Sequence, residues 1–401
     1  MTAMHAATAG HALILVLNCG SSSIKFALFD AITTPLQRHP VWNGKVQGIG
    51  TARPDFGETG VEPHVIDLDP EHPYRDALNL ILQRVQIWLG DRRLMAVAHR
   101  VVHGGSKYSV PVRIDATILQ DLRRYIPLAP LHQPFALEAI EILLRQQPSL
   151  PQVACFDTAF HRTIPQVEQF LPLPHAAWER GLRRYGFHGL SYEYLSIALP
   201  ERHGTQAEGR TIAAHLGNGA SLCAMHGLRS QATTMGFSAL DGLMMGTRTG
   251  SLDPGAVLYL MEIEQLSLEE VGRILYHESG LKGVSGISAD PRDLLANEAD
   301  EPRARLALDM YVNRVVREIG ALTAVLGGLD MLVFTAGIGE HSVELRRRIC
   351  SRLGWLGLDL DDAANTTQAT TLSAPTSRVR IAMEPTNEEW IAALHVLDLC
   401  T

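Results

Sequence analysis

Apolar segments of two kinds alternate along the chain, and this alternation is the pattern of an α/β protein. The near-continuous apolar run at residues 13–17 predicts a strand buried in the middle of a sheet, and residues 24–29 predict its hairpin partner. The next segment has apolar residues at helical spacing, which predicts a helix. These residues are Ala77, Ile81, Leu82, Val85, Trp88 and Leu89.

Apolar runs and the helical spacing of apolar residues also predict the other strands and helices. Further strands are predicted at residues 94–102, 153–156, 211–216, 221–225, 331–334 and 378–383. Further helices are predicted at residues 135–145, 303–326 and 388–399. Segments rich in glycine, proline, charge or threonine predict loops at residues 51–73 and 363–371. A strand, a glycine turn and a second strand open each half of the chain, so we expect two structurally related halves, although no sequence repeat of fixed period accompanies them.

Composition narrows the class of protein. A length of 401 residues predicts two or three domains, and the net charge of −8 argues against broad binding of nucleic acid or anionic membranes. The five cysteines are scattered without CxxC spacing, which predicts reduced thiols in a cytoplasmic protein, with neither disulfides nor zinc. No apolar stretch reaches the about 18–20 residues of a membrane span. Residues 1–10 lack Lys and Arg, so we expect a loose tail and not a signal peptide.

The turn between the first two predicted strands reads NCGSSSIK, residues 18–25. Gly20 would free the backbone, successive N–H groups and serine hydroxyls would face an anion, and Lys25 would add a positive charge for phosphate. The side-chain oxygen of Asn18 suits a hydrated Mg²⁺ ion. The turn is not a Walker loop, because no GxxxxGK[ST] pattern occurs. A polar hairpin turn with a surface lysine is the alternative.

Two further glycine turns suit a nucleotide. One reads HLGNGAS at residues 215–221, and its glycines permit a close approach of backbone to phosphate. The other reads TAGIGE at residues 335–340, between a predicted strand and an arginine-rich helix, where a helix N-terminus favours an anion. An ordinary Gly-Asn-Gly hairpin and a simple strand-to-helix connection are the alternatives.

Two arginines lie in glycine-flanked loops. Arg100 belongs to HRVVHGG with His103, and Arg248 belongs to MMGTRTG. The guanidinium fork matches a carboxylate or a phosphate, so these loops predict the binding of a small anion. Structural ion pairing is the alternative for each arginine.

Three more motifs place polar side chains at predicted element ends. Asp157 ends a strand in FDTAFH, His188 lies between an aromatic residue and a glycine in RRYGFHG, and Glu388 opens a helix in MEPTNEEW. The alternatives are a helix N-cap for Asp157, a core histidine for His188 and a favourable helix dipole for Glu388.

In their joint order, these motifs resemble the acetate and propionate kinase family. The phrases that carry the resemblance are NCGSSSIKFALFD, HRVVHGG, LAPLH, FDTAFH, RRYGFHG, HLGNGAS, LMMGTR, FTAGIGE and PTNEE. The resemblance spans nearly the whole chain and implies two ribonuclease-H-like domains around a nucleotide cleft, as in sugar kinases, heat-shock 70 ATPases and actin. The first domain would comprise residues 1–157 and 386–401, and the second residues 158–385. It also implies the reaction ATP + acetate ⇌ ADP + acetyl phosphate, with Mg²⁺ or Mn²⁺, in a cytoplasmic homodimer.

The resemblance also implies a role for each matching residue. The catalytic residues would be Asp157, His188 and Arg248. The carboxylate would be held by Arg100 and by an apolar pocket of Val102, Leu131 and Phe187. The metal would be held by Asn18 and Glu388, and the nucleotide phosphates by Lys25. The ATP site would be lined by His215, Leu216, Gly217, Asn218, Gly219, Asp290, Pro291, Arg292, Gly337, Ile338, Gly339, Glu340 and His341. For Asp157, holding Arg248 or the metal in place is an alternative to proton transfer.

The chain departs from the family's pattern at positions near the predicted pocket and nucleotide site. The departures are Gln133 for Asn, Leu190 for Thr, Tyr192 for His, Ala239 for Pro, Pro291 for Met or Phe, and His341 for Asn. Without the proline ring at Ala239, a substrate with one more methylene would fit, a difference of only about 1–3 kcal/mol. Propionate kinase is therefore the first alternative function. An ATP-binding module with slow ATPase activity and a protein partner is the second.

Overall fold

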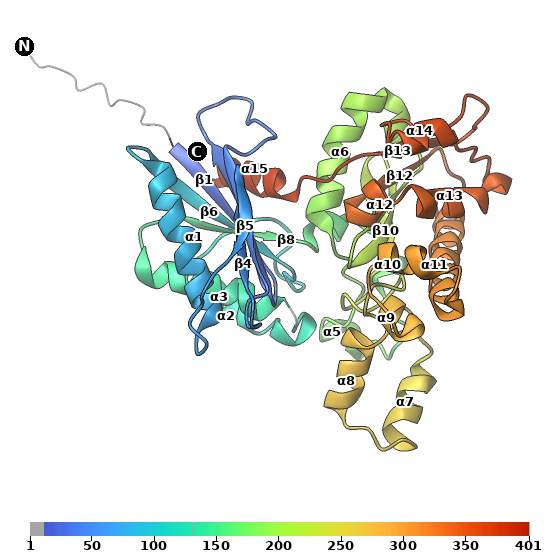
Figure 1. Ribbon diagram of the computed structural model, residues 1–401, viewed down its shortest axis with the longest axis horizontal. Helices are drawn as coiled ribbons and strands as arrows, with labels where there is room; N and C mark the ends of the chain where they lie inside the picture. Colours follow the sequence, from blue (N-terminus) through green and yellow to red (C-terminus); the bar gives the residue numbers. More distant parts are fainter. Residues whose placement is uncertain (1–11, 131, 401) are drawn as a thin grey trace, which may run out of the picture. The chain divides into compact units, whose positions relative to one another are not determined.

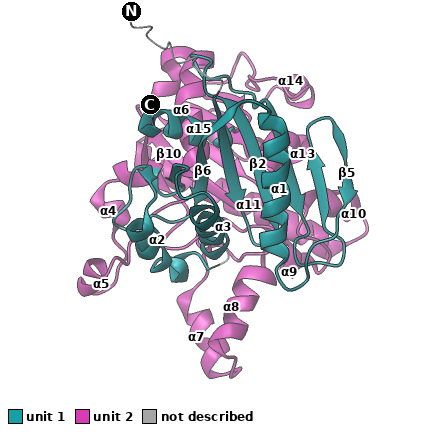
Figure 2. Ribbon diagram, turned by 90° about the vertical axis from the view of Figure 1, so that its left-hand side faces the viewer, with its two compact units in different colours: residues 1–159, 387–401 teal, residues 160–386 magenta. Residues whose placement is uncertain are grey.

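The computed structural model describes residues 12–130 and 132–400. They form two compact units, unit 1 with Met1–Ala159 and Asn387–Thr401, and unit 2 with Phe160–Thr386 (Figures 1 and 2). The predicted tail at residues 1–10 and the pocket residue Leu131 lie outside the described residues. Along the described chain, we find no helix that combines the length and apolar character needed to cross a membrane.

The sheet of unit 1 has the strand order β5-β4-β3-β2-β1-β6-β8-β7. Its strands are β1 (Ala12–Cys19), β2 (Ser23–Asp30), β3 (Trp42–Gln47), β4 (Asp55–Glu58), β5 (Val61–Val65), β6 (Arg93–Val101), β7 (Val112–Arg113) and β8 (Gln152–Phe156). The predicted hairpin is confirmed, because β1 and β2 pair antiparallel, while β6 and β8 continue the sheet parallel to β1.

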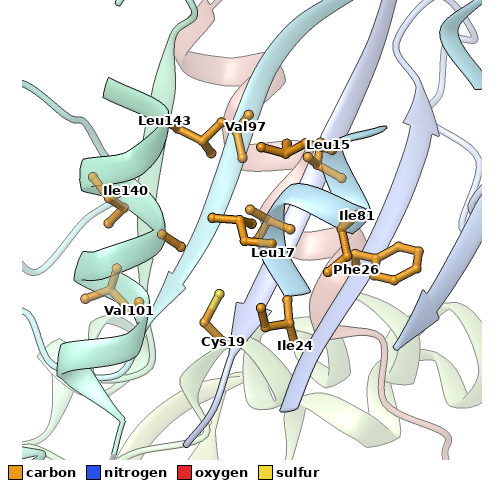
Figure 3. Packing of buried hydrophobic residues seen from close by; sticks show 14 of the residues in the cluster. Leu15, Leu17, Cys19, Ile24, Phe26, Ile81, Val97, Val101, Ile140 and Leu143 are labelled. Atoms are coloured by element: carbon orange, nitrogen blue, oxygen red, sulfur yellow. The ribbon is translucent and has the colours of Figure 1, made fainter. Parts of the chain in front are cut away.

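Helices cover the sheet of unit 1. They are α1 (Pro73–Leu89), α2 (Ala116–Arg123), η1 (Ile126–Leu128), α3 (Gln133–Gln146) and α15 (Glu388–Cys400), and η2 (Ala159–Thr163) begins at the unit boundary. Leu15 and Leu17 of β1 pack with residues of α1 and α3, such as Ile81 and Ile140 (Figure 3). The alternate residues of β1 are buried as well, and α15 contacts β1, β6 and β8. Strand β1 is therefore buried on both faces, as its continuous apolar run predicts.

The prediction of a loop at residues 51–73 is wrong at residues 55–58 and 61–65. Strands β4 and β5 form a hairpin there, joined by Thr59 and Gly60. The glycines, Pro63 and the charged residues of this segment obscured the strand pattern, and β5 is exposed along its whole length. Exposed edge strands lack the apolar alternation that identifies half-buried strands.

The sheet of unit 2 has the order β11-β10-β9-β12-β13. Its strands are β9 (Thr211–Leu216), β10 (Ala220–His226), β11 (Arg229–Thr233), β12 (Met331–Thr335) and β13 (Arg380–Met383). Strands β9, β10 and β11 are antiparallel, and β12 and β13 continue parallel to β9. The central strands of unit 1, β3-β2-β1-β6-β8, have the same order and directions. This shared order confirms the α/β class, the two related halves and the ribonuclease-H-like fold.

Unit 2 contains most of the helices. They are α4 (Gln166–Gln169), α5 (Ala176–Glu179), α6 (Gly189–His203), η3 (Gly204–Glu208), α7 (Pro254–Glu262), α8 (Leu268–His277), α9 (Gly280–Ser285), α10 (Pro291–Asn297), α11 (Pro302–Leu326), α12 (Ala336–His341), α13 (Val343–Ser351), η4 (Gly354–Leu356) and α14 (Asp362–Thr366). The loop predicted at residues 363–371 is wrong in its first part, because Asp361 accepts hydrogen bonds from the N–H groups of Ala363 and Ala364 and so caps α14.

The segment TAGIGE also differs from its prediction. Strand β12 ends at Thr335, and Gly337 and Gly339 lie inside α12 and not in a break before a helix. The sharp turn is made one residue earlier, where Ala336 has a φ of 63°. A non-glycine residue in this left-handed region is uncommon and indicates a constrained connection.

Candidate functional site

In unit 1, Arg100 and Asp157 form a bidentate ion pair at the carboxyl ends of two parallel strands. The Nε and Nη2 groups of Arg100 donate to Asp157 over 2.9 and 2.6 Å. The Asp157 side chain is 2% exposed and that of Arg100 19% exposed. Burial alone would lower the pKa of Arg100, but the carboxylates of Asp157 and Glu388 raise it above its ordinary value. The pair therefore stays charged.

The Arg100 guanidinium keeps donors for a further anion. Its Nη1 donates to Oδ1 of Asn18 over 3.1 Å, so three of its five N–H groups are engaged within the described residues. One N–H remains on each Nη nitrogen. Each of these N–H groups can donate a charge-assisted hydrogen bond to a carboxylate.

Asn18, near the end of β1, pairs with Lys25 of β2 across the hairpin. Ser21 and Ser22 are exposed. Gly20 does not serve the purpose predicted for it, because its φ lies outside the left-handed range and an added Cβ would meet only ordinary contacts at 3.6 Å. Lys25 lines a hollow of about 450 Å³ that also includes Lys45, Asn387 and Glu389.

Helix α15 brings acidic side chains to this region of unit 1. Asn387 accepts a hydrogen bond from the N–H of Trp390 over 3.1 Å and so caps the helix. Glu388 follows, and its Oε2 lies 3.6 Å from Nε of Arg100. Burial, and next the charge of Glu388, raise the pKa of Glu389. The motif PTNEE therefore opens a helix, as predicted, and the carboxylate of Glu388 lies beside Arg100.

The oxygen atoms around Arg100 are the ligand type that Mg²⁺ prefers. Asn18 supplies an amide oxygen and Glu388 a carboxylate. Across the residues with described positions, no group of three or more His, Cys, Asp or Glu side chains could hold a metal by itself. Mg²⁺ usually takes one or two carboxylates together with substrate phosphates and water, so the residues present fit this ion.

The loop after β6 is fixed by a buried amide. Oε1 of Gln133 accepts from the N–H of His103 over 3.1 Å, and Nε2 of Gln133 donates to the carbonyl of His103 over 3.0 Å. The His103 ring in turn accepts from the N–H of Gly105. Val102, predicted to line the apolar pocket, is buried next to this clamp. Gln133 therefore holds the backbone of the predicted pocket.

In unit 2, His188 and Arg248 converge beside Gly219. A Cβ added at Gly219 would lie 3.0 Å from Nη2 of Arg248 and 3.3 Å from Nε2 of His188, so these side chains would have to shift to make room for it. His188 itself has a φ of 60° at the start of α6. The Nη1 group of Arg248 donates to the carbonyl of Ala239 over 2.6 Å. Phe187 is buried in the same unit, and its carbonyl accepts from His161.

The His188 ring stacks on the ring of His215, with centroids 4.1 Å apart. Nδ1 of His188 lies 2.8 Å from Oγ of Ser221, and Nδ1 of His215 lies 2.9 Å from Oγ of Ser191. Oη of Tyr192 lies 2.6 Å from the same Ser221 hydroxyl. Ser221 is the last residue of the motif HLGNGAS, but the motif did not predict that its hydroxyl would contact His188.

A cavity of about 480 Å³ in unit 2 collects most of the residues predicted to bind ATP. Its lining residues are Gly217, Asn218, Ala289, Asp290, Pro291, Arg292, Gly337, Ile338, His341 and Ser342. Of the other predicted residues, His215 stacks on His188, Leu216 and Gly339 are buried, and Oε1 of Glu340 accepts from the N–H of Thr386. Ala289 and Ser342 were not predicted, because small residues outside a motif carry no sequence signal.

Arg346 is a buried residue that sequence reasoning missed. Its guanidinium donates to the carbonyls of Gly339 and Glu340, at the end of α12, and to Asn365. Burial lowers its pKa. A cation that binds the last carbonyls of a helix satisfies acceptors that have no partner within the helix. Arg346 thus fixes the helix that carries Gly337 and Ile338 to the cavity.

Comparisons with known proteins agree over nearly the whole chain. The Acetokinase family pattern matches residues 13–394. The acetate kinase of Rhodopseudomonas palustris is 50% identical over 390 residues, which cover 96% of this chain and 97% of that protein. The solved acetate kinase of Porphyromonas gingivalis is 34% identical, has a TM-score of 0.86, and is matched over 97% of this chain and 100% of its own. A solved propionate kinase from Francisella tularensis is 35% identical and has a TM-score of 0.89. The match covers 96% of this chain and 98% of that protein.

Proposed function

Because the chain belongs to the acetokinase family, we propose that it transfers a phosphoryl group from ATP to the carboxylate of acetate, reversibly and in one in-line step. One observation carries this proposal. Gly217 and Asn218 line the cavity of unit 2, and the next residue, Gly219, is where His188 and Arg248 converge. A nucleotide in the cavity would therefore present its phosphates to these two side chains.

The chemistry of the substrates explains the choice of side chains. A carboxylate is already ionised at neutral pH, so the attacking oxygen needs no base. The difficulty is the approach of two anions, and positive groups placed beside the transferring phosphoryl group stabilise its charge. Arg248 and His188 suit that role in unit 2.

We infer that Asp157 orients Arg100. Both carboxylate oxygens of Asp157 accept from the guanidinium, which is the arrangement of an ionised carboxylate and not of a proton donor. Arg100 would then hold the acetate carboxylate through its two remaining N–H groups, next to Val102. This assignment favours the positioning role for Asp157 over proton transfer.

Asn18 and Glu388 are the residues that would hold Mg²⁺. When bound, the ion would supply positive charge that offsets the charge of the phosphates. Arg100 lies beside both side chains, which keeps the amide of Asn18 oriented and offsets the charge of Glu388.

Trapping of the acyl phosphate with hydroxylamine tests the proposed reaction. The full chain should form acetyl hydroxamate only when ATP, a divalent ion and acetate are all present. ATP hydrolysis that no added carboxylate changes would contradict the proposal and would favour an ATP-binding module with a protein partner.

Propionate is the second candidate substrate. The similarity to a solved propionate kinase and the small Ala239, whose carbonyl holds Arg248, both favour it. The ratio of kcat/KM for acetate, propionate and butyrate separates the two candidates. A preference for propionate of more than about tenfold would replace acetate as the main substrate.

We also propose a cytoplasmic homodimer, as the family resemblance implies. Helices α7 and α8 lie side by side in unit 2 (Figure 1), and none of the α7 residues is buried although the helix is mostly apolar. Leu258, Tyr259, Ile263 and Leu268 are exposed there. A second copy would cover this surface. Light scattering should give twice the mass of the chain, and Ile263→Glu should reduce it.

A further inference from the structure

Three hydroxyl and imidazole groups of unit 2 form a chain of contacts behind the predicted catalytic histidine. Oη of Tyr192 lies 2.9 Å from the carbonyl oxygen of Ser221 and 2.6 Å from Oγ of the same residue. Oγ of Ser221 lies 2.8 Å from Nδ1 of His188. All three side chains are buried.

The positions of the protons in this chain follow from what each group can donate. A carbonyl oxygen only accepts, so the contact between Tyr192 and the carbonyl of Ser221 is a hydrogen bond only when Tyr192 gives its single proton to that carbonyl. Oη of Tyr192 then accepts the proton of the Ser221 hydroxyl. With its proton engaged, Oγ of Ser221 can only accept from Nδ1 of His188. In this arrangement of protons, Nδ1 of His188 carries a hydrogen.

We propose that Tyr192 is a positioning residue that holds a proton on Nδ1 of His188, so that Nε2 can donate to the transferring phosphoryl group only when the ring is doubly protonated. This inference rests on the proposed phosphoryl transfer. A neutral ring in this state would present a lone pair at Nε2, which repels an anion. The resembling family has His at this position, and an imidazole can either accept or donate there, whereas the tyrosine hydroxyl fixes one direction.

The charges around His188 also affect whether its ring takes up a second proton. Arg248 lies beside Nε2 at Gly219, and the stacked ring of His215 covers one face of the imidazole. A guanidinium near Nε2 disfavours a second positive charge, while a bound phosphate favours it. Catalysis should therefore decline as pH rises and the ring loses its second proton.

The tautomer can be measured without activity. In the full-length protein labelled with ¹⁵N-histidine, neutral His188 should show a protonated Nδ1 and an unprotonated Nε2, with its signals assigned by their absence in His188→Asn. Tyr192→Phe frees the Ser221 proton to bond Nδ1, so the variant should show a mixture of tautomers. A wild-type ring protonated at Nε2, or an unchanged tautomer in Tyr192→Phe, would overturn the proposal.

Kinetics provide the second measurement. As pH rises, kcat for acetyl phosphate formation should decrease by a factor about three times smaller in Tyr192→Phe than in the wild type. The reason is that a neutral ring in the variant could donate from Nε2. Tyr311→Phe is the matched control, since its hydroxyl is also buried in unit 2 and has no hydrogen-bond partner in the described part of the chain. The control should keep the wild-type pH profile. If Tyr192→Phe kept that profile too, the positioning role would be contradicted. A wild-type protein that forms no acyl phosphate would contradict the proposed function and leave the tautomer measurement valid.

Discussion

Arg100 in unit 1 and Arg248 in unit 2 are both predicted to face substrate, but the two units hold them differently. Arg100 is fixed by both oxygens of Asp157 and by Asn18, with Glu388 nearby. Arg248 donates to the neutral carbonyl of Ala239 and lies against Gly219. From this difference we expect Arg100 to contribute both to folding and to binding, and Arg248 to contribute mainly to catalysis.

Removing the guanidinium from unit 1 should cause the largest change in stability. Arg100→Ala removes the guanidinium that donates to both carboxylate oxygens of the buried Asp157, and breaking a buried ion pair costs about 3–5 kcal/mol in the free energy of unfolding. Urea denaturation measures this loss. Arg100→Ala with Asp157→Asn should recover part of the stability but not the affinity for acetate. A single variant as stable as the wild type would show that the pair does not stabilise unit 1.

Removing the guanidinium from unit 2 should act on rate. Arg248→Ala should lower kcat by about 10²–10³-fold, as the loss of one preorganised donor does in other enzymes, and change stability by less than about 1 kcal/mol. Steady-state assays and thermal melting measure the two effects. Arg248→Lys keeps the charge without the fork and should restore little of the rate. A variant with wild-type kcat would remove Arg248 from the catalytic residues.

Acid should weaken both units through one buried histidine in each. Burial lowers the pKa of His99 in unit 1 and of His161 in unit 2 to about 4. The unfolded chain takes up protons below about pH 6.5 while the folded units do not, so stability falls as pH decreases from there towards 4, by roughly 3 kcal/mol for each histidine. Urea denaturation across this range should show a shallower decline for His99→Gln than for the wild type. The exposed His64→Gln is the control, and an equal decline in both variants would contradict the prediction.

The smallest expected effect concerns Gly219. Gly219→Ala brings a methyl group against Arg248 and His188 and should lower kcat by about tenfold through their displacement. Gly272→Ala is the control, because nothing lies within 4 Å of its added Cβ in α8 and alanine favours the helix by about 0.5–1 kcal/mol. Equal activity of the two variants would show that the close approach at Gly219 has no role.

The sequence predicted buried elements better than exposed ones. The continuous apolar runs of β1, β9 and β12 identified the central strands, since burial on both faces leaves a strong pattern. The hairpin of β4 and β5 has an exposed, proline-containing strand, and its backbone pairing leaves no such pattern. The helix α14 was missed because a cap at Asp361 and not apolar spacing defines it.

The candidate site, like the fold, could be predicted from the sequence only in part. Glycine-rich motifs located the cavity of unit 2 and the convergence at Gly219, because close approach requires glycine. The family resemblance supplied the roles. The residues that hold the site in place, such as Gln133, Ser221 and Arg346, were not identified, since their effect depends on hydrogen bonds between segments distant in sequence.

Helix α15 has a consequence for synthesis of the protein on the ribosome. The sheet face formed by β1, β6 and β8 is complete once residue 156 has been made, but the helix that packs on it begins at Glu388. Unit 2 lies between them in the chain and can fold first as a continuous segment. The nascent chain would therefore carry an uncovered apolar face until its last helix emerges, a state in which chaperone binding would protect it.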